Sequence, residues 1–350
     1  MSHRPNRLYL SSDALVANWR ALDRLSGAAA CGAAVKADGY GLGARAVVER
    51  LLGAGCRDLF VATWAEAERL APLAGEAGAS LVVLHGLREE DLPALAALPR
   101  VRPVLSTAAQ VARWRTVAVA GQACDVMVDT GMNRLGVSAE EIAAGLLDGL
   151  VIDTLMSHLA CADEPGATMN EAQRARFAAL AGRSAARRMS LANSAGITLG
   201  SGYHFDLTRP GLALYGGVPV PALAGAICPV ATIAAEVLQC RMVRAGETVG
   251  YNATWRADAD TQVAIVNLGY ADGYRRALSN RGCAFVGDAP MPVIGRVSMD
   301  LVALDATAAA VREGDWVRFD DDLAHVAAAS GVSQYELLTG LGQRFDRYWS

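Results

Sequence analysis

Short apolar runs alternate with helix-favouring stretches through the first two thirds of the chain, and this alternation restricts the fold more than any other feature. Each run is long enough for a buried parallel strand and too short for a core helix. The runs lie at residues 32–36, 59–63, 81–85, 101–105, 125–129, 154–158, 189–192 and 212–215. Eight strands alternating with helices predict an α/β fold, a (β/α)8 barrel of the TIM type.

The pattern changes after about residue 218. Segments 237–243, 262–268 and 292–302 show β-branched alternation and are separated by glycine turns, which predicts a smaller C-terminal all-β domain. We therefore expect a barrel over residues 11–218 and a β-domain over residues 219–350, with a stiff Pro-rich boundary at 218–221. Residues 1–10 should contribute an N-terminal strand that associates with the β-domain.

Composition and charge exclude several classes of protein. The chain has 350 residues, a net charge of −4, and basic residues that are dispersed along the sequence, so we expect no nucleic-acid partner. No apolar run approaches the ~20 residues of a membrane span, and residues 1–10 resemble neither a signal peptide nor an anchor. The seven cysteines form no C-x-x-C pair and the five histidines are scattered. We expect a cytoplasmic protein with reduced cysteines and no metal.

Lys36 ends one of the apolar runs and is followed by three glycines and a tyrosine. Burial lowers the pKa of a lysine and so favours its neutral amine, the form that makes a Schiff base with an aldehyde. A lysine that extends to solvent from a strand end is the competing interpretation, and this segment alone does not decide between them.

Several polar residues directly follow predicted strands. In a barrel, the carboxyl ends of the strands form one face, where active sites lie. We therefore expect Lys36, Arg134, His158, Asn193 and Arg209 to converge on one mouth of the barrel.

Six motifs occur in the order found in alanine racemases, which are enzymes of fold type III that depend on pyridoxal 5'-phosphate. The chain resembles this family from about residue 5 to its C-terminus. The motifs are AAVKADGYGLG at 33–43, DTGMNRLG at 129–136, TRPGLALYG at 208–216, VGYNAT at 249–254, GYADGY at 269–274 and GRVSMD at 295–300.

The resemblance implies an enzyme that interconverts L-alanine and D-alanine by two acid/base groups acting on opposite faces of the substrate. Lys36 would carry the pyridoxal 5'-phosphate as an aldimine and exchange a proton on one face. Tyr251 of the other subunit would act on the opposite face. This division implies a homodimer with shared active sites.

The resemblance also assigns cofactor and substrate contacts. Arg209 would face the ring nitrogen of the cofactor and, having no acceptor, would leave that nitrogen unprotonated, which favours racemisation over transamination. Arg134 would orient the substrate carboxylate by a charge-assisted hydrogen bond. The other implied cofactor contacts are Tyr40, His158, Asn193, Ser194, Gly211, Leu212 and Tyr348, and the other implied substrate contacts are Tyr270, Met299 and Asp300.

Three positions depart from the usual pattern of the family. Leu42 and Ser190 replace common histidines, and Met127 stands where many members carry a carbamylated lysine that pairs with the substrate-orienting arginine. These changes put in question how Arg134 and Arg209 are held.

Three other functions remain as alternatives. A serine racemase or a broader amino-acid racemase would share the same architecture. A related decarboxylase would favour a glutamate and a cysteine where this chain has Arg209 and Tyr251. A non-catalytic protein that binds pyridoxal phosphate would be a single barrel, without the β-domain.

Overall fold

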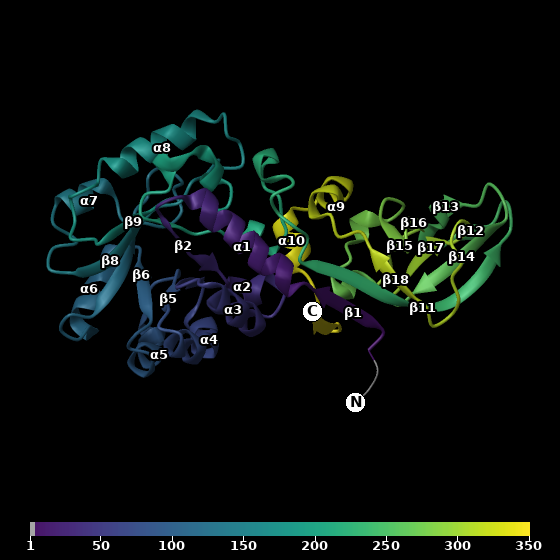
Figure 1. The fold of residues 1–350 in the computed structure, drawn as a ribbon, viewed down its shortest axis with the longest axis horizontal. Coiled ribbons are helices and arrows are strands. Elements are labelled where there is room, and N and C mark those ends of the chain that lie inside the picture. The colour runs from purple at the N-terminus through teal and green to yellow at the C-terminus, as the bar shows by residue number, and fades with distance from the viewer. Residues whose placement is uncertain (1–3) are drawn as a thin grey trace. The chain divides into compact units, whose positions relative to one another are not determined.

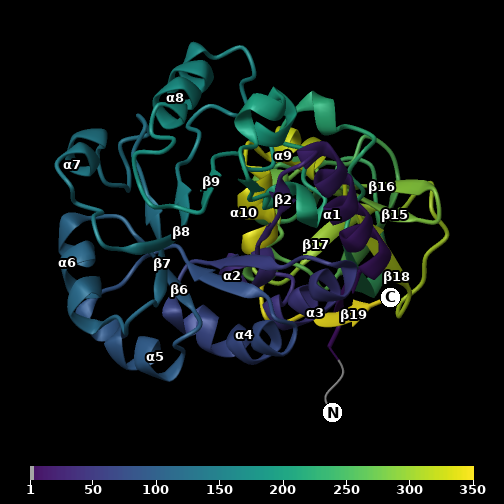
Figure 2. The ribbon, with the colours of Figure 1, turned by 60° about the vertical axis from the view of Figure 1, so that its left-hand side comes forward.

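Parallel strands form the framework of the barrel unit, which comprises Leu15–Leu214 and Pro219–Ile227 of the computed structural model (Figures 1 and 2). The structure describes residues 4–350, so residues 1–3 of the expected N-terminal segment lie outside it. Seven of the described strands follow one another in a single parallel sheet. In sheet order they are β3 (Ala33–Ala34), β4 (Asp58–Val61), β5 (Ser80–Val83), β6 (Arg102–Leu105), β7 (Ala123–Met127), β8 (Val151–Met156) and β9 (Arg188–Ser190).

Strand β10 (Leu207–Thr208) completes the barrel. It pairs in parallel with β2 (Ala30–Cys31), which precedes β3 by one residue. Around it, the Arg209 amide donates to the carbonyl of Ala192 at 2.8 Å, and the Gly32 amide donates to the carbonyl of Thr208 at 2.9 Å. The strand therefore connects both ends of the parallel sheet, and the predicted fold class is confirmed.

Helices cover the outside of this barrel, as Figure 2 shows for α4 to α8. Side-chain caps begin three of them, because the hydroxyls of Thr63, Thr107 and Ser138 each accept from an amide in the first turn. The helices are α1 (Ser12–Ser26), α3 (Ala44–Ala54), α4 (Trp64–Glu76), α5 (Leu92–Ala97), α6 (Ala108–Val117), α7 (Ala139–Ala143) and α8 (Thr168–Ala178), whereas α2 (Lys36–Tyr40) is a left-handed turn. Short 3-10 turns are η1 (Glu89–Asp91), η2 (Gly196–Leu199), η3 (Ser201–Tyr203), η4 (Leu212–Tyr215) and η5 (Pro221–Leu223).

The eighth strand does not lie where the apolar pattern placed it. Residues 212–215 form the 3-10 turn η4, and the strand is β10, five residues earlier. Pro210 has no amide hydrogen for a strand ladder, and the Gly211 amide donates to the side chain of Ser194 at 2.9 Å. The apolar run reflects burial, since Leu212 to Tyr215 are all 2% exposed or less.

Antiparallel strands form the second unit, which comprises residues 4–14, Tyr215–Val218 and Cys228–Ser350. They close into a ring because the long strand β11 pairs with β18 through one part of its length and with β14 through the other, across a register shift at 237–239. Around the ring the strands are β11 (Ala231–Val243), β14 (Thr261–Val266), β17 (Val302–Asp305), β16 (Ala289–Ile294), β15 (Cys283–Val286) and β18 (Trp316–Phe319).

Both ends of the described chain belong to this β-unit. Strand β1 (Asn6–Leu10) pairs antiparallel with β11 and parallel with β19 (Asp346–Trp349). The remaining elements of the unit are β12 (Thr248–Val249), β13 (Trp255–Arg256), α9 (Leu323–Ser330), α10 (Gln334–Thr339), and the turns η6 (Tyr251–Ala253), η7 (Tyr270–Asp272) and η8 (Arg276–Leu278). No helix among residues 4–350 is both long and apolar enough to cross a membrane.

Ion pairs that are largely buried connect the barrel strands toward their amino ends. Arg188 donates to Asp58 and to Asp153, both at 2.7 Å, while Arg102 pairs with Asp125 at 3.2 Å and with Asp153 at 3.0 Å. The Asp125 side chain is fully buried. Burial raises the pKa of Asp125 to about 6, although the neighbouring Arg102 opposes this shift. The ion pairs connect β4, β6, β7, β8 and β9 at the end of the barrel opposite the strand carboxyl ends.

The buried carboxyl of Asp125 leads to a prediction for the pH dependence of folding. Its pKa rises from 3.8 in the unfolded chain to about 6 in the folded chain, so its contribution to stability declines as pH rises through that interval. Asn does not titrate in this range, so the stability of Asp125→Asn lacks this pH dependence. The free energy of unfolding of the variant, minus that of the native chain, should therefore increase from pH 4 to pH 6. Urea unfolding at pH 4, 5, 6 and 7 measures this difference. Asp163→Asn, at an exposed position, is the control; a difference independent of pH for Asp125→Asn would contradict the prediction.

Candidate active site

Cationic groups gather around His158 at the carboxyl ends of the barrel strands. His158 follows β8, and its pKa is lowered to about 3 by burial and by the positive charges of Arg209, Arg134 and Lys36. These charges come from three other strand–loop junctions. The structure therefore places four of the residues expected at the mouth close enough to influence one another. The imidazole is neutral throughout the physiological pH range.

Lys36 is the only lysine in the 350-residue chain, whose other side-chain cations are arginines and histidines. It is half-buried. The residue before it, Val35, is held by its amide, which donates to the carbonyl of Phe60 at 2.8 Å. The pKa of the Lys36 amine is lowered by burial and by the charge of Arg134, and it is raised by the carboxylate of Glu66. Only this side chain can supply a primary amine to an aldehyde.

The residues that follow Lys36 form a left-handed turn. Ala37, Asp38, Gly39 and Tyr40 have φ values of 52°, 54°, 62° and 55°, with Gly41 at 86°. Each L-residue in this conformation costs about 1–2 kcal/mol, so tertiary contacts must hold the turn. Glycine is favoured at position 39 for a second reason, because a Cβ atom there would lie 3.1 Å from the Cα of Ala44. The sequence indicated a glycine loop after a strand that reaches Lys36, whereas the strand ends at Ala34.

Hydroxyl and amide groups form a small cradle beside this turn. Tyr40 is buried, and a Cβ atom on Gly211 would lie 2.3 Å from the Tyr40 hydroxyl oxygen. Ser194 Oγ accepts from the amides of Gly211 at 2.9 Å and Ala213 at 3.2 Å. The amide of Leu212 donates to no acceptor among the described residues. Hydroxyls and backbone amides in this arrangement suit an anion such as a phosphate.

Asn193 shapes the loop that carries Ser194. Its side-chain Oδ1 accepts from the Gly196 amide at 2.9 Å, so the residue closes the turn after β9. This contact fixes the start of η2, which lies next to the cradle in sequence.

Arg209 is buried and held by neutral partners. Nη1 of the guanidinium donates to Ser190 Oγ, and Nη2 donates to the carbonyl of Ser157. Ser190 Oγ in turn donates to the carbonyl of Leu207. Burial lowers the pKa of Arg209 to about 10, which leaves the group charged at neutral pH. Ser190, one of the three departures from the family pattern, therefore takes part directly in holding Arg209.

Arg134 lies on an exposed loop that is shaped by the side chain of Asp129. Asp129 Oδ1 accepts from the amides of Gly131 at 2.8 Å and Asn133 at 3.1 Å. No carboxylate of the described barrel residues pairs with the Arg134 guanidinium, and Met127 packs against the apolar core of the barrel. Since Lys36 is the only lysine, no carbamylated lysine of the chain can take the place of Met127.

Gln173 is a buried residue of this region that the sequence reasoning missed. From α8 its side-chain amide donates to the carbonyl of His158 at 2.9 Å and accepts from the Ala160 amide at 2.8 Å. The side-chain nitrogen of Gln173 also donates to the hydroxyl of Thr130 at 3.3 Å. Gln173 thus connects the loops that carry His158 and Arg134. The only signal in the sequence was a polar residue on the buried face of a helix.

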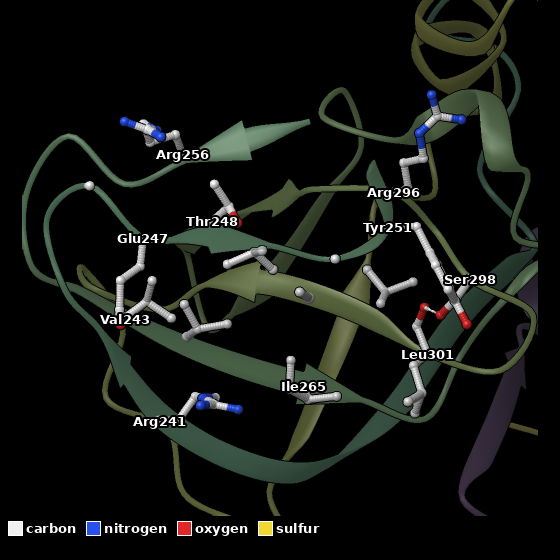
Figure 3. A pocket seen from close by; sticks show the side chains of 16 residues that line it. Arg241, Val243, Glu247, Thr248, Tyr251, Arg256, Ile265, Arg296, Ser298 and Leu301 are labelled. Carbon is white, nitrogen blue, oxygen red and sulfur yellow. Dashed lines mark hydrogen bonds between the residues drawn. The ribbon is translucent and has the colours of Figure 1, made fainter. Parts of the chain in front are cut away.

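The β-unit carries a second group of expected site residues. Tyr251 is 67% exposed and lines a cavity of about 790 Å³. Figure 3 shows Tyr251, Ser298 and Leu301 at one end of this cavity and Arg241 and Arg256 toward the other.

Tyr270, Met299 and Asp300 lie on two loops of the β-unit that are bound to each other. The Tyr270 amide donates to the carbonyl of Ser298 at 3.0 Å, and a Cβ atom on Gly269 would lie 2.1 Å from the carbonyl oxygen of Met299. Arg344 bonds both Asp300 and the buried Asp272, each at 2.7 Å. These contacts hold the three residues near Ser298, which also lines the cavity beside Tyr251.

Tyr348 contacts residues of the β-unit other than those around the cavity. On β19 its ring lies 5.8 Å from the ring of Tyr9 and 5.7 Å from the guanidinium of Arg7. The side chain is 46% exposed, and its role in phosphate binding stays a prediction.

Comparisons with known proteins identify relatives over nearly the full length of the chain. Residues 10–219 match the family model "Alanine racemase, N-terminal domain", and residues 230–349 match "Alanine racemase, C-terminal domain". An alanine racemase of Acidiphilium cryptum is 44% identical, with 97% of each chain covered, and one of Dinoroseobacter shibae is 44% identical, with 98% of this chain and 97% of the relative covered. A crystal structure of alanine racemase from Bartonella henselae with covalently bound pyridoxal phosphate superposes with a TM-score of 0.92 at 32% identity and complete coverage of both chains.

The contact between Ser190 and Arg209 leads to a stability prediction. Ser190→Ala removes the hydroxyl and leaves a buried guanidinium donor unsatisfied, which should lower the free energy of unfolding by about 1–3 kcal/mol. Chemical denaturation measures the loss. Ser201→Ala removes an exposed hydroxyl and should change the stability little. Equal losses in the two variants would show that the Ser190 hydroxyl does not hold Arg209.

Proposed function

Because the chain belongs to the alanine racemase family, we propose that it interconverts L-alanine and D-alanine with pyridoxal 5'-phosphate as its cofactor. The Bartonella henselae relative, which holds that cofactor covalently, supports the choice of cofactor. The strongest support from the chain itself is its only lysine, which lies half-buried beside Arg134 and His158 with a lowered pKa.

The residues of the barrel mouth fit this cofactor. Lys36 would hold its aldehyde carbon. The hydroxyls of Tyr40 and Ser194 and the backbone at Gly211 and Leu212 would hold its phosphate, together with Tyr348. The buried guanidinium of Arg209 would face the ring nitrogen, and the neutral imidazole of His158 would lie against the ring. When bound, pyridoxal phosphate withdraws electrons from the Cα of an amino acid and so acidifies its hydrogen.

Lys36 would move the proton on one face of the substrate. Burial and the charge of Arg134 lower the pKa of its amine, which brings proton exchange closer to neutral pH. A single group can only remove and return a proton on one face. Racemisation therefore requires a second acid/base group on the other face.

Tyr251 would supply that second group, from the other subunit of a homodimer with shared sites. Its phenol is exposed on the β-unit, where another chain can meet it. Tyr270, Met299 and Asp300, held near Ser298 by the backbone bonds and by Arg344, would line the entrance from the same side.

Arg209 and Arg134 would select the outcome and the substrate. Arg209 has only donors and is fixed by Ser190 and by the carbonyl of Ser157, so it could not accept a hydrogen bond from a protonated ring nitrogen. Arg134 has no carboxylate partner in the barrel unit and remains available for the substrate carboxylate. All seven cysteines are free, which fits the reducing cytoplasm in which we place the enzyme.

Lys36→Ala should abolish racemisation in both directions, because the variant chain contains no lysine at all. Polarimetry with each enantiomer measures the activity. Intact mass after borohydride reduction should show a cofactor adduct on the native chain and none on the variant. A reducible adduct retained by the variant, or persisting racemisation, would refute the role of Lys36.

Tyr251→Phe should reduce racemisation by about 100-fold to 10,000-fold, the range for loss of a general acid/base group. Mixing this variant with Lys36→Ala chains under subunit exchange should restore activity to about a quarter of the native value, because half of randomly formed dimers would hold one intact site of two.

A chain that carries both substitutions is the matched control, since its mixture with Tyr251→Phe contains no intact site. If subunit exchange is verified and the two single variants still restore nothing, Lys36 and Tyr251 do not act across subunits.

A further inference from the structure

The carboxylate of Glu66 bridges two loops of the barrel mouth directly behind Lys36. Its Oε1 accepts from the Ala37 amide at 2.7 Å. Its Oε2 accepts from the amide of Ala62 at 2.7 Å and from that of Thr63 at 3.3 Å. We propose that Glu66 is a positioning residue for the reaction, one that fixes the left-handed turn after Lys36 and thereby the direction of the amine. This inference rests on the proposed function of Lys36.

The contact between Glu66 Oε2 and the Thr63 amide is part of the normal start of a helix. Thr63 and Glu66 form a capping box for α4, in which the glutamate accepts from the amide of the N-cap residue and the N-cap hydroxyl accepts from the glutamate amide. The box occupies only Oε2. Oε1 reaches outside its own helix, to the residue next to the chain's only lysine.

The Ala37 amide needs a partner from outside the turn. Within the turn, the amides of Gly39 and Gly41 donate to the carbonyls of Val35 and Ala37, at 3.0 Å and 2.9 Å. Ala37 lies at the start of the turn, where no preceding carbonyl is in place to accept from its amide. Glu66 satisfies this donor with a charge-assisted hydrogen bond.

The other end of the turn is held independently. Asp38 Oδ1 accepts from the Ala44 amide at 2.9 Å, at the beginning of α3. The turn is therefore fixed to α3 at one end and to α4 at the other. Loss of the Glu66 contact frees the end that carries Lys36 and leaves the Asp38 end in place.

Glu66 also balances the charges that act on Lys36. The charge of Arg134 lowers the pKa of this amine, and the charge of Glu66 raises it. The nearby His158 is neutral. A substitution that removes the carboxylate should therefore have both a geometric and an electrostatic effect. The two effects can be separated by the choice of variant.

Three variants test the proposal on the full chain. Glu66→Gln removes the charge and one of the two acceptors. Glu66→Asp keeps the charge and shortens the reach. Glu68→Gln removes an exposed carboxylate from the same helix and is the matched control. Thermal unfolding of each variant first establishes that it folds.

Amide exchange of the peptide covering residues 36–44 tests the geometric effect. Exchange should become about tenfold faster in both Glu66 variants, as expected for loss of one charge-assisted hydrogen bond, and should stay unchanged in Glu68→Gln. Unchanged exchange in both folded Glu66 variants would overturn the proposal. Equal acceleration in Glu68→Gln would overturn it as well.

The pH dependence of Lys36 acylation, on the full chain freed of cofactor, tests the electrostatic effect. Mass spectrometry reads a single side chain, because no other lysine exists. The midpoint of reaction should move to lower pH in Glu66→Gln, move less in Glu66→Asp, and stay in place in Glu68→Gln. A midpoint unchanged in Glu66→Gln would show that this carboxylate does not act on Lys36.

Racemisation by the cofactor-loaded variants completes the test. In both Glu66 variants, kcat should fall about tenfold while KM for alanine changes less than about twofold, since Arg134 is expected to position the substrate carboxylate. A change confined to KM would overturn the positioning role. Amide exchange and acylation do not depend on racemisation, so a failure of the proposed function would leave both of their results interpretable.

Discussion

Burial of positive charge at the barrel mouth is the constraint on which the rest of the site depends. Arg209 is buried and Lys36 half-buried, and both influence His158 together with Arg134. A buried charge is tolerated only when hydrogen bonds compensate for the lost solvation. The structure supplies neutral partners to Arg209 and a carboxylate near Lys36. Arg209 therefore stays fixed and charged, while burial and Arg134 lower the pKa of Lys36 and Glu66 opposes that shift.

The second constraint is backbone strain beside Lys36. The left-handed turn is unfavourable for Ala37, Asp38 and Tyr40, and the contacts of Glu66, Asp38 and the buried ring of Tyr40 offset this cost together with the backbone bonds of the turn. Lys36 thus gains a defined direction through its neighbours, although its own side chain is long and flexible. The role that we assign to Glu66 follows from this dependence.

The β-unit holds exposed residues in a defined geometry. Arg344 joins Asp272 to Asp300, and backbone bonds join the loops of Tyr270 and Met299. Tyr251 remains exposed beside these loops. Such an arrangement suits residues that act on another chain, as proposed for the homodimer.

The sequence alone determined the class of fold, because periodicity reports burial and the short apolar runs at 59–63, 81–85 and 101–105 did become strands. It also indicated Lys36 as a candidate, since a lysine at the end of a buried run is chemically unusual, whereas the role of Arg209 came from the resemblance of its motif. The same periodicity misplaced the eighth strand, because a buried 3-10 turn and a buried strand produce the same apolar pattern. Only the tertiary structure decided that Lys36 precedes a left-handed turn, that Ser190 holds Arg209, and that Glu66 reaches Ala37. These features depend on contacts between residues far apart in the chain, and local pattern carries no information about which distant donor will meet which acceptor.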